Sequence, residues 1–435
     1  MRTIHKNFFT NCMCSLALLA TVCMTGCRQD PKTEPIKDPI VDSYSPESGR
    51  SGTEIAIQGE NFGNEIADVK VWINGLLAEV VSVSPTRIYA VVPRAAGSGS
   101  IKVTIREKAF DLSTPFTFES VRNVYTYSGS GAAVTVDGEL RNASFNKPYW
   151  LTYDKKDDAL FVLEEGRKVR RIKDGLVETV ASLTGSINNP RSITMSITCD
   201  TIFIGNDNAA NNSNVTVGIL TRDTDFKVQK DYVLSTNDTR YVNFAGIHPV
   251  DGTLMMYTWL RKLYKWNKTT NSVELLYNLA SVIPNDAYAN FCFSPDGNTM
   301  YVVVKYPFIG ILKGQYNQST KEIVGGFQVF AGTGSWGAAD GLGTAASFDQ
   351  PAQATVDSYG RIYIAEKFNH WVRMVTPAGE VSRYAGDGGA GNQGFVDGDM
   401  LSAKFDQPEG IAMDSEGNIY VADLVNSRIR VIREE

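Results

Sequence analysis

The sequence contains few of the residues that build metal centres or disulfide frameworks. Its 435 residues include three histidines and six cysteines, and four of the cysteines lie within the first 27 positions. Beyond that point only His248 and His370 remain, so a metal site with three histidine ligands cannot be built. Cys199 and Cys292 fall in different repeats of the pattern described below, and we expect single buried thiols rather than a stabilising disulfide.

The chain also lacks several signatures of catalysis and of nucleic-acid binding. It contains neither a G-x-S-x-G elbow nor a Walker A phosphate loop. Its formal net charge is −6, and about −8 once Arg2 and Lys6 are removed with a leader, because 40 basic and 48 acidic residues remain. Nucleic acid is therefore not an expected partner, since its phosphates bind basic surfaces.

The first 27 residues have the layout of a secretory signal peptide. Arg2 and Lys6 precede an apolar run from Leu16 to Val22, which is too short to span a bilayer. The run is followed by M-T-G-C, which resembles a lipobox and implies that Cys27 becomes the lipid-bearing mature N-terminus. We expect membrane attachment through this lipid anchor only. The alternative is a soluble secreted protein in which the cysteine is incidental.

Residues 28–39 are rich in proline and charge, so they are expected to form a flexible tether. The acidic residues soon after the cysteine are similar to the export signals of surface lipoproteins in Gram-negative gut bacteria with Sus-like glycan-uptake systems. This resemblance implies an outer-membrane protein that faces the cell exterior. Retention on the periplasmic side is the alternative.

Two tandem copies of one unit occupy the C-terminal end of the chain. Residues 348–375 and 405–432 align without a gap at a constant offset of 57 residues. Each copy has an apolar run after a proline, a D-S-x-G turn, an I-Y-[IV]-A run and a closing R-[IM]-V segment. The two-residue alternation predicts three short strands per copy. Internal periodicity of this length is typical of solenoids and propellers.

The repeat resembles the blades of NHL-repeat β-propellers. The matching positions in the last copy are Pro408, Asp414, Gly417, Tyr420, Ala422, Asp423, Asn426 and Arg430. Weaker copies are marked by Pro148 with Asp154, by Pro190, by Gly246 with Asp251, and by Asp296 with Gly297. With the two clear copies they predict a six-bladed propeller over residues 121–435.

The chain ends just after the third strand of the last blade, so the fourth strand must come from elsewhere. Residues 123–131 (NVYTYSGSG) end in the same aromatic-[AS]-G-x-G pattern as the outer strands of blades four and five. We predict that this segment pairs beside residues 428–432 and closes the ring, with Tyr125 and Tyr127 on the strand face opposite Val124. An open repeat array is the alternative.

Residues 40–119 precede the propeller and have their own pattern. Glycines and a proline make turns, Ile55 and Ile57 alternate inward, and Asn74-Gly75 is a hairpin signal. The segment resembles the IPT/TIG family, an immunoglobulin-like sandwich. The positions that carry the resemblance are Pro46, Gly49, Gly52, Thr53, Gly59, Asn61, Phe62 and Gly63. The overall fold class predicted is therefore all-β, with an Ig-like (IPT/TIG) domain followed by a six-bladed NHL-type propeller.

Residues just after the start of each inner strand should surround the mouth of the central channel. Aromatic rings beside amide, guanidinium and carboxylate groups suit a sugar, whose C–H faces stack on rings while its hydroxyls take polar contacts. The ligand-binding candidates are Tyr149, Trp150, Arg191, Asn290, Gln353 and Glu409, together with Trp336 in the loop before blade five. Ala245 is the residue that the alignment places at the mouth from blade three. An ordinary water-filled mouth is the alternative.

Carboxylates and amides recur at the ends of the second strands. Equivalent positions there are occupied by Glu164, Asn206, Glu366 and Asp423, which have the donor types that Ca²⁺ takes. The simpler interpretation makes them partners of neighbouring strands.

Three related loops have the form G-x-G, D-G, then Ala or Ser before Phe. We expect them to be structural turns in the first place and ligand-binding loops only in the second. No metal or other cofactor is predicted.

Three functions remain open at this level. The favoured one is a non-catalytic, lipid-anchored surface protein that binds a polysaccharide or oligosaccharide for a Sus-like uptake system, in which an outer-membrane transporter is a potential partner. The second is a protein-interaction scaffold on the cell surface, because NHL-like propellers bind proteins on one face. The third is a Ca²⁺-dependent propeller hydrolase or lyase, which requires a metal in the channel.

Overall fold

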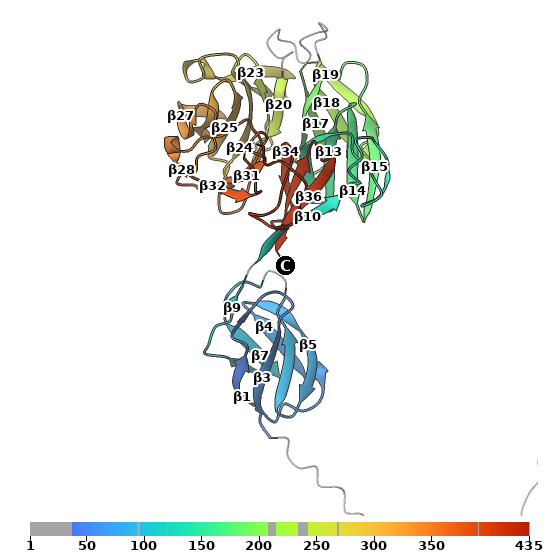
Figure 1. The fold of residues 1–435 in the computed structure, drawn as a ribbon, viewed down its shortest axis with the longest axis vertical. Coiled ribbons are helices and arrows are strands. Elements are labelled where there is room, and N and C mark those ends of the chain that lie inside the picture. Colours follow the sequence, from blue (N-terminus) through green and yellow to red (C-terminus); the bar gives the residue numbers. More distant parts are fainter. Residues whose placement is uncertain are drawn as a thin grey trace, which may run out of the picture.

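The computed structural model describes residues 37–93, 96–119, 121–207, 215–233, 242–267, 269–389 and 391–434. The predicted signal peptide, Cys27 and nearly all of the predicted tether lie outside these residues. The described chain is almost entirely β-structure, with a small domain and a larger ring of sheets (Figure 1). Its helical turns are η1 (Ile66–Asp68), η2 (Arg222–Thr224), η3 (Leu279–Ser281) and η4 (Gly343–Ala345). In the ranges given above, none of the helices has the length and hydropathy needed to cross a membrane.

The small domain is an Ig-like sandwich with strand order β1-β3-β6-β5-β4-β7-β8. Its strands are β1 (Ile40–Ser45), β2 (Ser48–Gly49), β3 (Glu54–Glu60), β4 (Val69–Ile73), β5 (Leu76–Ser84), β6 (Arg87–Val91), β7 (Ile101–Ile105), β8 (Lys108–Asp111) and β9 (Thr117–Phe118). β5 pairs with β4 through residues 76–78 and with β6 through residues 79–84, so it contributes to both layers. β2 and β9 form a short parallel pair.

Alternation along the strands explains why this domain folds as a sandwich. Ile55 and Ile57 of β3 and Ile101 and Val103 of β7 have no exposed surface, whereas the residues between them are partly or fully exposed. Complete burial of one such side chain contributes about 1.5–3 kcal/mol. Asn74 and Gly75, with φ of 48° and 79°, form the predicted two-residue turn between β4 and β5.

The ring contains six four-stranded blades in the described part of the chain, which confirms the predicted propeller (Figure 1). The inner strands are β12 (Pro148–Asp154), β16 (Pro190–Met195), β20 (Val242–Ile247), β24 (Tyr288–Phe293), β29 (Pro351–Val356) and β34 (Pro408–Met413). The second strands are β13 (Ala159–Glu164), β17 (Thr201–Asn206), β21 (Leu254–Thr258), β25 (Thr299–Tyr306), β30 (Ile362–Glu366) and β35 (Ile419–Asp423).

The remaining strands form the outer half of each blade. The third strands are β14 (Lys168–Lys173), β18 (Val215–Thr221), β22 (Lys262–Asn267), β26 (Ile309–Asn317), β31 (Trp371–Val375) and β36 (Arg428–Glu434). The fourth strands are β15 (Leu176–Ser182), β19 (Gln229–Val233), β23 (Ser272–Asn278), β27 (Glu322–Gly334), β32 (Glu380–Ala385) and β10 (Arg122–Ser128). The short strands β11 (Gly138–Glu139), β28 (Gly341–Leu342) and β33 (Gly398–Asp399) extend the sheets of blades one, five and six.

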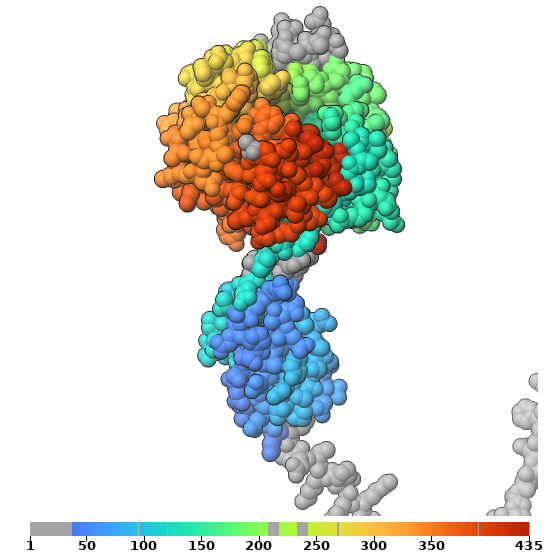
Figure 2. All heavy atoms as spheres, in the orientation of Figure 1, coloured from blue at the N-terminus to red at the C-terminus, as the bar shows by residue number. Residues whose placement is uncertain are grey.

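Ring closure follows the sequence prediction. β10 pairs antiparallel with β36, with Arg122 opposite Glu434 and Tyr125 opposite Val431. Val124 is fully buried, whereas Tyr125 and Tyr127 lie half-buried on the other face of the strand. Each inner strand contacts the next around the ring, and β34 contacts β12, so the first and last blades lie side by side (Figure 2). The blade made of the two ends of this domain therefore has no free edge at β36.

Three blades share one buried arginine arrangement. Arg170, Arg373 and Arg430 on the third strands have no exposed side-chain surface. Each donates through Nη1 to the acid that ends the second strand, at 3.0 Å for Glu164 and Glu366 and 2.9 Å for Asp423. In each case the guanidinium lies 5.1 Å from the centroid of the phenylalanine ring that follows the loop.

The same arginines also hold the recurring D-G loops in place. Nη2 donates to Asp137, Asp340 and Asp397 at 2.8, 2.8 and 2.6 Å in blades one, five and six respectively. A second Nη2 bond goes to a backbone carbonyl of the same loop in each blade. The loops are therefore structural turns, as the sequence indicated, and one guanidinium fixes a strand, an acid and a loop together.

Candidate functional site

The first residues of the inner strands surround one mouth of the central channel. The strand register places six residues at equivalent positions there, and we call this set the mouth ring: Tyr149, Arg191, Asn243, Ala289, Ala352 and Glu409. For blade three the alignment indicated Ala245, but Ala245 pairs with Met256 as Leu151 pairs with Val162, further along the strand. Blade three has no proline to anchor the alignment, which explains the two-residue error.

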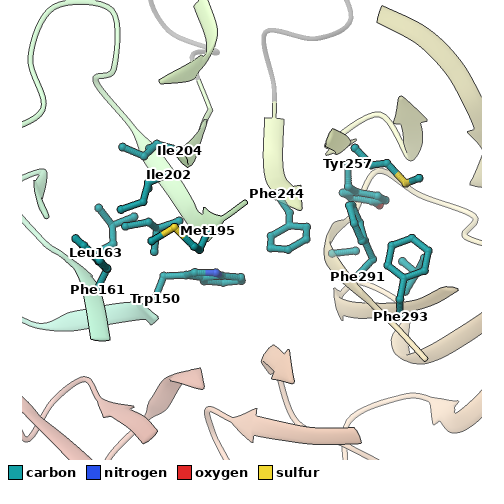
Figure 3. Packing of buried hydrophobic residues seen from close by; sticks show 14 of the residues in the cluster. Trp150, Phe161, Leu163, Met195, Ile202, Ile204, Phe244, Tyr257, Phe291 and Phe293 are labelled. Carbon is teal, nitrogen blue, oxygen red and sulfur yellow. The ribbon is translucent and has the colours of Figure 1, made fainter. Parts of the chain in front are cut away.

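The next residue on each inner strand forms a second layer that fills the channel. We call this set the plug ring: Trp150, Ser192, Phe244, Asn290, Gln353 and Gly410. The rings of Trp150 and Phe244 lie 5.7 Å apart although they belong to different blades (Figure 3). A Cβ on Gly410 would lie 3.1 Å from the Cα of Trp150, so this side of the plug leaves no room for a side chain.

Polar groups of the plug ring are used to join neighbouring blades. Gln353 donates to the carbonyl of Leu151 at 2.7 Å and accepts from the backbone N–H groups of Leu151 and Ile411 at 3.0 and 3.1 Å. Asn290 donates to the carbonyl of Ala352 at 2.8 Å. These amides link blades five, six and one, and blades four and five, while satisfying buried backbone groups.

A cavity of about 440 Å³ lies above this plug, at the mouth ring. Its size falls within the range of roughly 300–1,000 Å³ that is typical of small-molecule sites. The lining residues are Trp150, Arg191, Asn243, Tyr288, Ala289, Asn290, Lys305, Tyr306, Gln350, Ala352 and Glu409. We call it the mouth cavity. A separate cavity of about 230 Å³ lies further along the same strands, beside Thr152, Thr194 and Thr355.

Several polar atoms in the mouth cavity have no protein partner. Within the described ranges, Trp150 Nε1, both side-chain amide atoms of Asn243, and Arg191 Nε are buried without a hydrogen bond. Trp150 and Asn243 are only 7% and 6% exposed. A buried donor without a partner costs about 1–3 kcal/mol, so these groups are suited to pairing with a bound polar ligand.

Charged groups converge at one side of the cavity. Glu409 accepts from Lys305 and from Lys367, both at 2.7 Å. Burial alone would raise the pKa of Glu409, but the two ammonium groups outweigh it and lower the pKa to about 2. Burial lowers the pKa of Lys305; Glu409 opposes this, and the like charges of Lys367 and Arg191 add to it.

Aromatic rings complete the lining. Arg191 lies over the ring of Tyr288 at 5.7 Å, and Tyr288 in turn lies 4.4 Å from Trp259. Tyr306 is 45% exposed. Such an arrangement offers flat apolar faces next to a guanidinium and amides.

The structure brings together four of the seven residues selected from sequence. Trp150, Arg191, Asn290 and Glu409 line the mouth cavity, and Tyr149 lines an adjoining groove that also contains Arg191 and Glu409. Tyr149 donates to the carbonyl of Pro190 at 2.8 Å. Gln353 lies in the plug ring, as described above. Trp336 lies outside the cavity lining and is 65% exposed.

Sequence reasoning missed the cavity residues of blade four other than Ala289 and Asn290, and Asn243 of blade three. Lys305 and Tyr306 end the long second strand of blade four, and Tyr288 begins its inner strand. A lysine at the end of the apolar run Y-V-V-V-K was the available signal for this part of the site. Asn243 was missed through the alignment error in blade three.

The residues considered for Ca²⁺ have other partners. Glu164, Glu366 and Asp423 bind the buried arginines, and Asn206 accepts from the backbone of Asn189 at 2.9 Å. Burial raises the pKa of Glu366 and Asp423, opposed by their arginines. Among the described residues there is no group of three or more His, Cys, Asp or Glu side chains arranged to hold a metal ion.

Of the two histidines and two cysteines of the described chain, His248, His370 and Cys199 are buried, the thiol as expected, whereas Cys292 is partly exposed. His248 lies 2.9 Å from the carbonyl of Gly297 through Nε2, and His370 accepts from the backbone of Gln407 at 3.0 Å. Cys199 and Cys292 are free thiols. Burial raises the pKa of Cys292 to about 12, which keeps it protonated and unreactive.

The fold and cavity define a two-domain protein with an Ig-like domain and a six-bladed propeller. The chain matches the IPT/TIG domain over residues 39–120 and the NHL repeat over residues 405–432. Both resemblances deduced from the residues are thereby confirmed.

Curated relatives share only part of their length with this chain. Protein SUPPRESSOR OF QUENCHING 1, chloroplastic, from Arabidopsis thaliana is 23% identical over 311 residues, which cover 70% of this chain and 26% of that protein. NHL repeat-containing protein 2 from Gallus gallus is 30% identical over 117 residues, covering 26% of this chain and 16% of that protein. The chain thus spans about a quarter or less of these relatives.

Solved structures resemble the chain over both domains. An auxiliary nutrient binding protein from Bacteroides thetaiotaomicron is 29% identical with a TM-score of 0.64, and the match covers 92% of this chain and 99% of that one. An auxiliary nutrient binding protein from Bacteroides ovatus has a TM-score of 0.70 at 22% identity, with coverages of 92% and 99%. The second likeness establishes the shared fold.

Proposed function

We propose that this protein is a non-catalytic carbohydrate-binding protein of a Sus-like glycan-uptake system. Its ligand is a polysaccharide or oligosaccharide that enters the mouth cavity of the propeller. Cys27 carries a lipid that anchors the chain to the outer membrane, and the propeller faces the cell exterior. The similarity at 29% identity to an auxiliary nutrient binding protein, whose match extends over almost all of both chains, supports this assignment.

The observation that carries the proposal is the combination of unpartnered polar groups and aromatic rings in one cavity above a closed plug. Trp150 Nε1 and the Asn243 amide offer hydrogen bonds that no protein group takes in the described chain. Tyr288 and Tyr306 offer ring faces in the same cavity. Sugars combine apolar C–H faces with many hydroxyls, so they match both features.

The ligand contacts proposed here follow from the lining. They are Trp150, Arg191, Asn243, Asn290, Lys305, Tyr306 and Glu409, with Tyr149 in the adjoining groove. Gln353 supports them from the plug ring by holding the strands that carry Trp150 and Glu409. Trp336 is proposed as an outer stacking platform for chains longer than the cavity.

The direct test is isothermal titration calorimetry of residues 37–435 against a panel of plant and host oligosaccharides. Trp150→Phe keeps an aromatic ring at this position but removes Nε1–H, and we expect roughly fivefold weaker binding from the loss of one hydrogen bond. Trp72→Phe in the Ig-like domain is the matched control and should leave affinity unchanged. Equal affinity of Trp150→Phe and wild type would show that the sugar does not bind at Trp150 in the mouth cavity.

The alternative function, a protein-interaction scaffold on the cell surface, predicts a different result with the same oligosaccharide panel. A scaffold would recover an outer-membrane transporter in a pull-down but bind no member of the sugar panel.

Membrane attachment has its own test, because Cys27→Ser should abolish incorporation of radiolabelled fatty acid and release the protein from membranes. Labelling that persists in Cys27→Ser would contradict the assignment of the anchor.

A further inference from the structure

The mouth of the propeller is basic although the protein as a whole is acidic. The mouth cavity and the adjoining groove share Arg191 and Glu409, so they lie next to each other, and we call the two together the opening. The basic residues that line it are Lys147, Arg167, Arg191, Lys305 and Lys367, against two acids, Glu165 and Glu409. The formal charge of the chain is −6. A local excess of one sign in a concave site concentrates ligands of the opposite sign.

Internal ion pairs do not neutralise this excess. One carboxylate, Glu409, is shared between two ammonium groups, Lys305 and Lys367, and both contacts are 2.7 Å. Glu165 pairs with Lys147 at 3.2 Å. These pairs leave one unit of positive charge among their own members.

Arg191 brings further positive charge to the centre of the opening. It contacts Asp207 only through Nη2 at 3.4 Å, and Asp207 lines neither the cavity nor the groove. With Asp207 counted, the basic side chains named above still outnumber the acids by two. The side chain is 41% exposed and is stacked on Tyr288, which orients its planar fork.

The neutral groups of the cavity point to the rest of the ligand. Trp150 Nε1 and the Asn243 amide are buried donors and an acceptor without protein partners in the described ranges, and both residues line the cavity. A simple inorganic anion would use the cations but leave these groups unpaired. A ligand that satisfies all of them needs an anionic group attached to a body with several hydroxyls.

We propose that the mouth cavity selects a sugar residue that carries an anionic group, a carboxylate or a sulfate, which binds between Arg191 and Lys305. The inference rests on the carbohydrate-binding function proposed above and names its ligand class. The hydroxyls of the same residue bind Trp150 and Asn243. Because the plug ring closes the channel beneath the cavity, the acidic residue enters from the open face, as the end of a chain or as a short oligosaccharide.

Matched sugars test the ligand class. Residues 37–435 are titrated with an oligosaccharide of galacturonic acid, with the galactose oligosaccharide of the same linkage, and with a sulfated galactose oligosaccharide. We expect at least tenfold tighter binding of one anionic member than of the neutral one. The anionic advantage should shrink as salt is raised from 20 to 500 mM, because exposed charges are screened over about 10 Å at 0.1 M salt.

Two charge variants at the mouth are expected to change the affinity for the anionic sugar in opposite directions. Arg191→Gln should weaken binding of the anionic sugar about tenfold, and by clearly more than it weakens binding of the neutral sugar. Glu409→Gln removes the competing carboxylate and should strengthen anion binding severalfold, which a merely structural role would not do. Lys102→Gln in the Ig-like domain is the control: it also removes one positive charge, and it should not change the affinity for either sugar. Thermal melts of each variant check folding.

The outcomes separate the two proposals. Preference for the uronic acid or for the sulfated sugar supports the inference and identifies the anionic group. Equal or tighter binding of the neutral sugar overturns it but leaves carbohydrate binding in place. Failure of all sugars, acidic and neutral, to bind contradicts both the inference and the proposed function.

Discussion

The propeller consists of two halves that solve the same packing problem differently. Blades one, five and six each place an arginine on the third strand opposite an acid at the end of the second strand. In blades two, three and four the register places Gly218, Tyr264 and Leu312 at the arginine position. Asn206, Thr258 and Val304 replace the acids there.

This difference separates the blades that keep the repeat, which are one, five and six, from those that depart from it, which are two to four. The arginine arrangement pairs both guanidinium Nη groups with the second-strand acid and the loop, so it fixes the loops. Blades one, five and six therefore look alike in sequence, and they meet where the ring closes. Blades two to four have apolar packing in its place and contribute Arg191, Asn243, Tyr288, Lys305 and Tyr306 to the mouth cavity. The regular blades therefore close the ring, and the divergent blades contribute most of the lining of the candidate site.

Removal of β10 should have the largest effect, because it opens the regular half. A chain that begins at Ala132 loses the pairing with β36 and the burial of Val124. We expect aggregation or loss of cooperative unfolding, since an unpaired strand edge and its apolar contacts are exposed. Size-exclusion chromatography and calorimetry compare it with a chain that begins at Ser120. Identical monomeric melting of the two chains would refute closure through β10.

The arginine arrangement can be tested against its apolar counterpart at the same register position. Arg373→Met leaves Glu366 buried without its partner and should lower the free energy of unfolding by about 3–5 kcal/mol. Leu312→Met in blade four conserves volume and should cost less than about 1.5 kcal/mol. Urea denaturation measures both. Similar losses in the two variants would show that the halves do not differ in the way described.

Because Glu409 is ion-paired, we expect the free energy of unfolding to depend on pH in the acid range. Its pKa is lowered to about 2 in the folded protein, below the ordinary 4.5. A lowered carboxylate pKa stabilises the fold above the unfolded value and loses that contribution as pH falls from 4.5 toward 2, on the order of 3 kcal/mol. The stability difference between wild type and Glu409→Gln should be constant above pH 5.5 and shrink below it. A difference that is unchanged down to pH 2.5 would contradict the pairing with Lys305 and Lys367.

Trp336 should give the smallest effect, and it marks the outer limit of the site. It is 65% exposed in the loop between blades four and five and lines no part of the mouth cavity. Trp336→Ala should change the free energy of unfolding by less than about 0.5 kcal/mol. It should weaken binding of a long polysaccharide about threefold and of a short oligosaccharide not at all, as measured by affinity electrophoresis and calorimetry. Loss of short-ligand binding would place Trp336 in the cavity instead.

Much of the fold was readable from local pattern. The glycine and proline turns and two-residue alternation of residues 40–119 predicted the Ig-like domain, and the gapless repeat predicted the blades. The ending of residues 123–131 predicted closure because it matches the ends of the fourth strands of blades four and five, and the last blade had no fourth strand of its own. Each of these features depends on neighbours in sequence or on an exact repeat, so no distant contact had to be known.

The sequence by itself determined the all-β class, the two domains, the six blades and most inner-strand positions, because turn chemistry and strand alternation are local properties. It also placed four residues in the cavity, through prolines in blades one, two and six and through the D-G turn of blade four. Only the tertiary structure decided that Asn243 rather than Ala245 reaches the mouth, since blade three has no proline to set the register. The tertiary structure also added Tyr306, and Lys305 and Lys367, which come from blades four and five and both pair with Glu409 of blade six. It assigned the Gln353 amide to the plug. Burial, ion pairing and unpartnered donors arise from residues distant in sequence, and no local pattern encodes them.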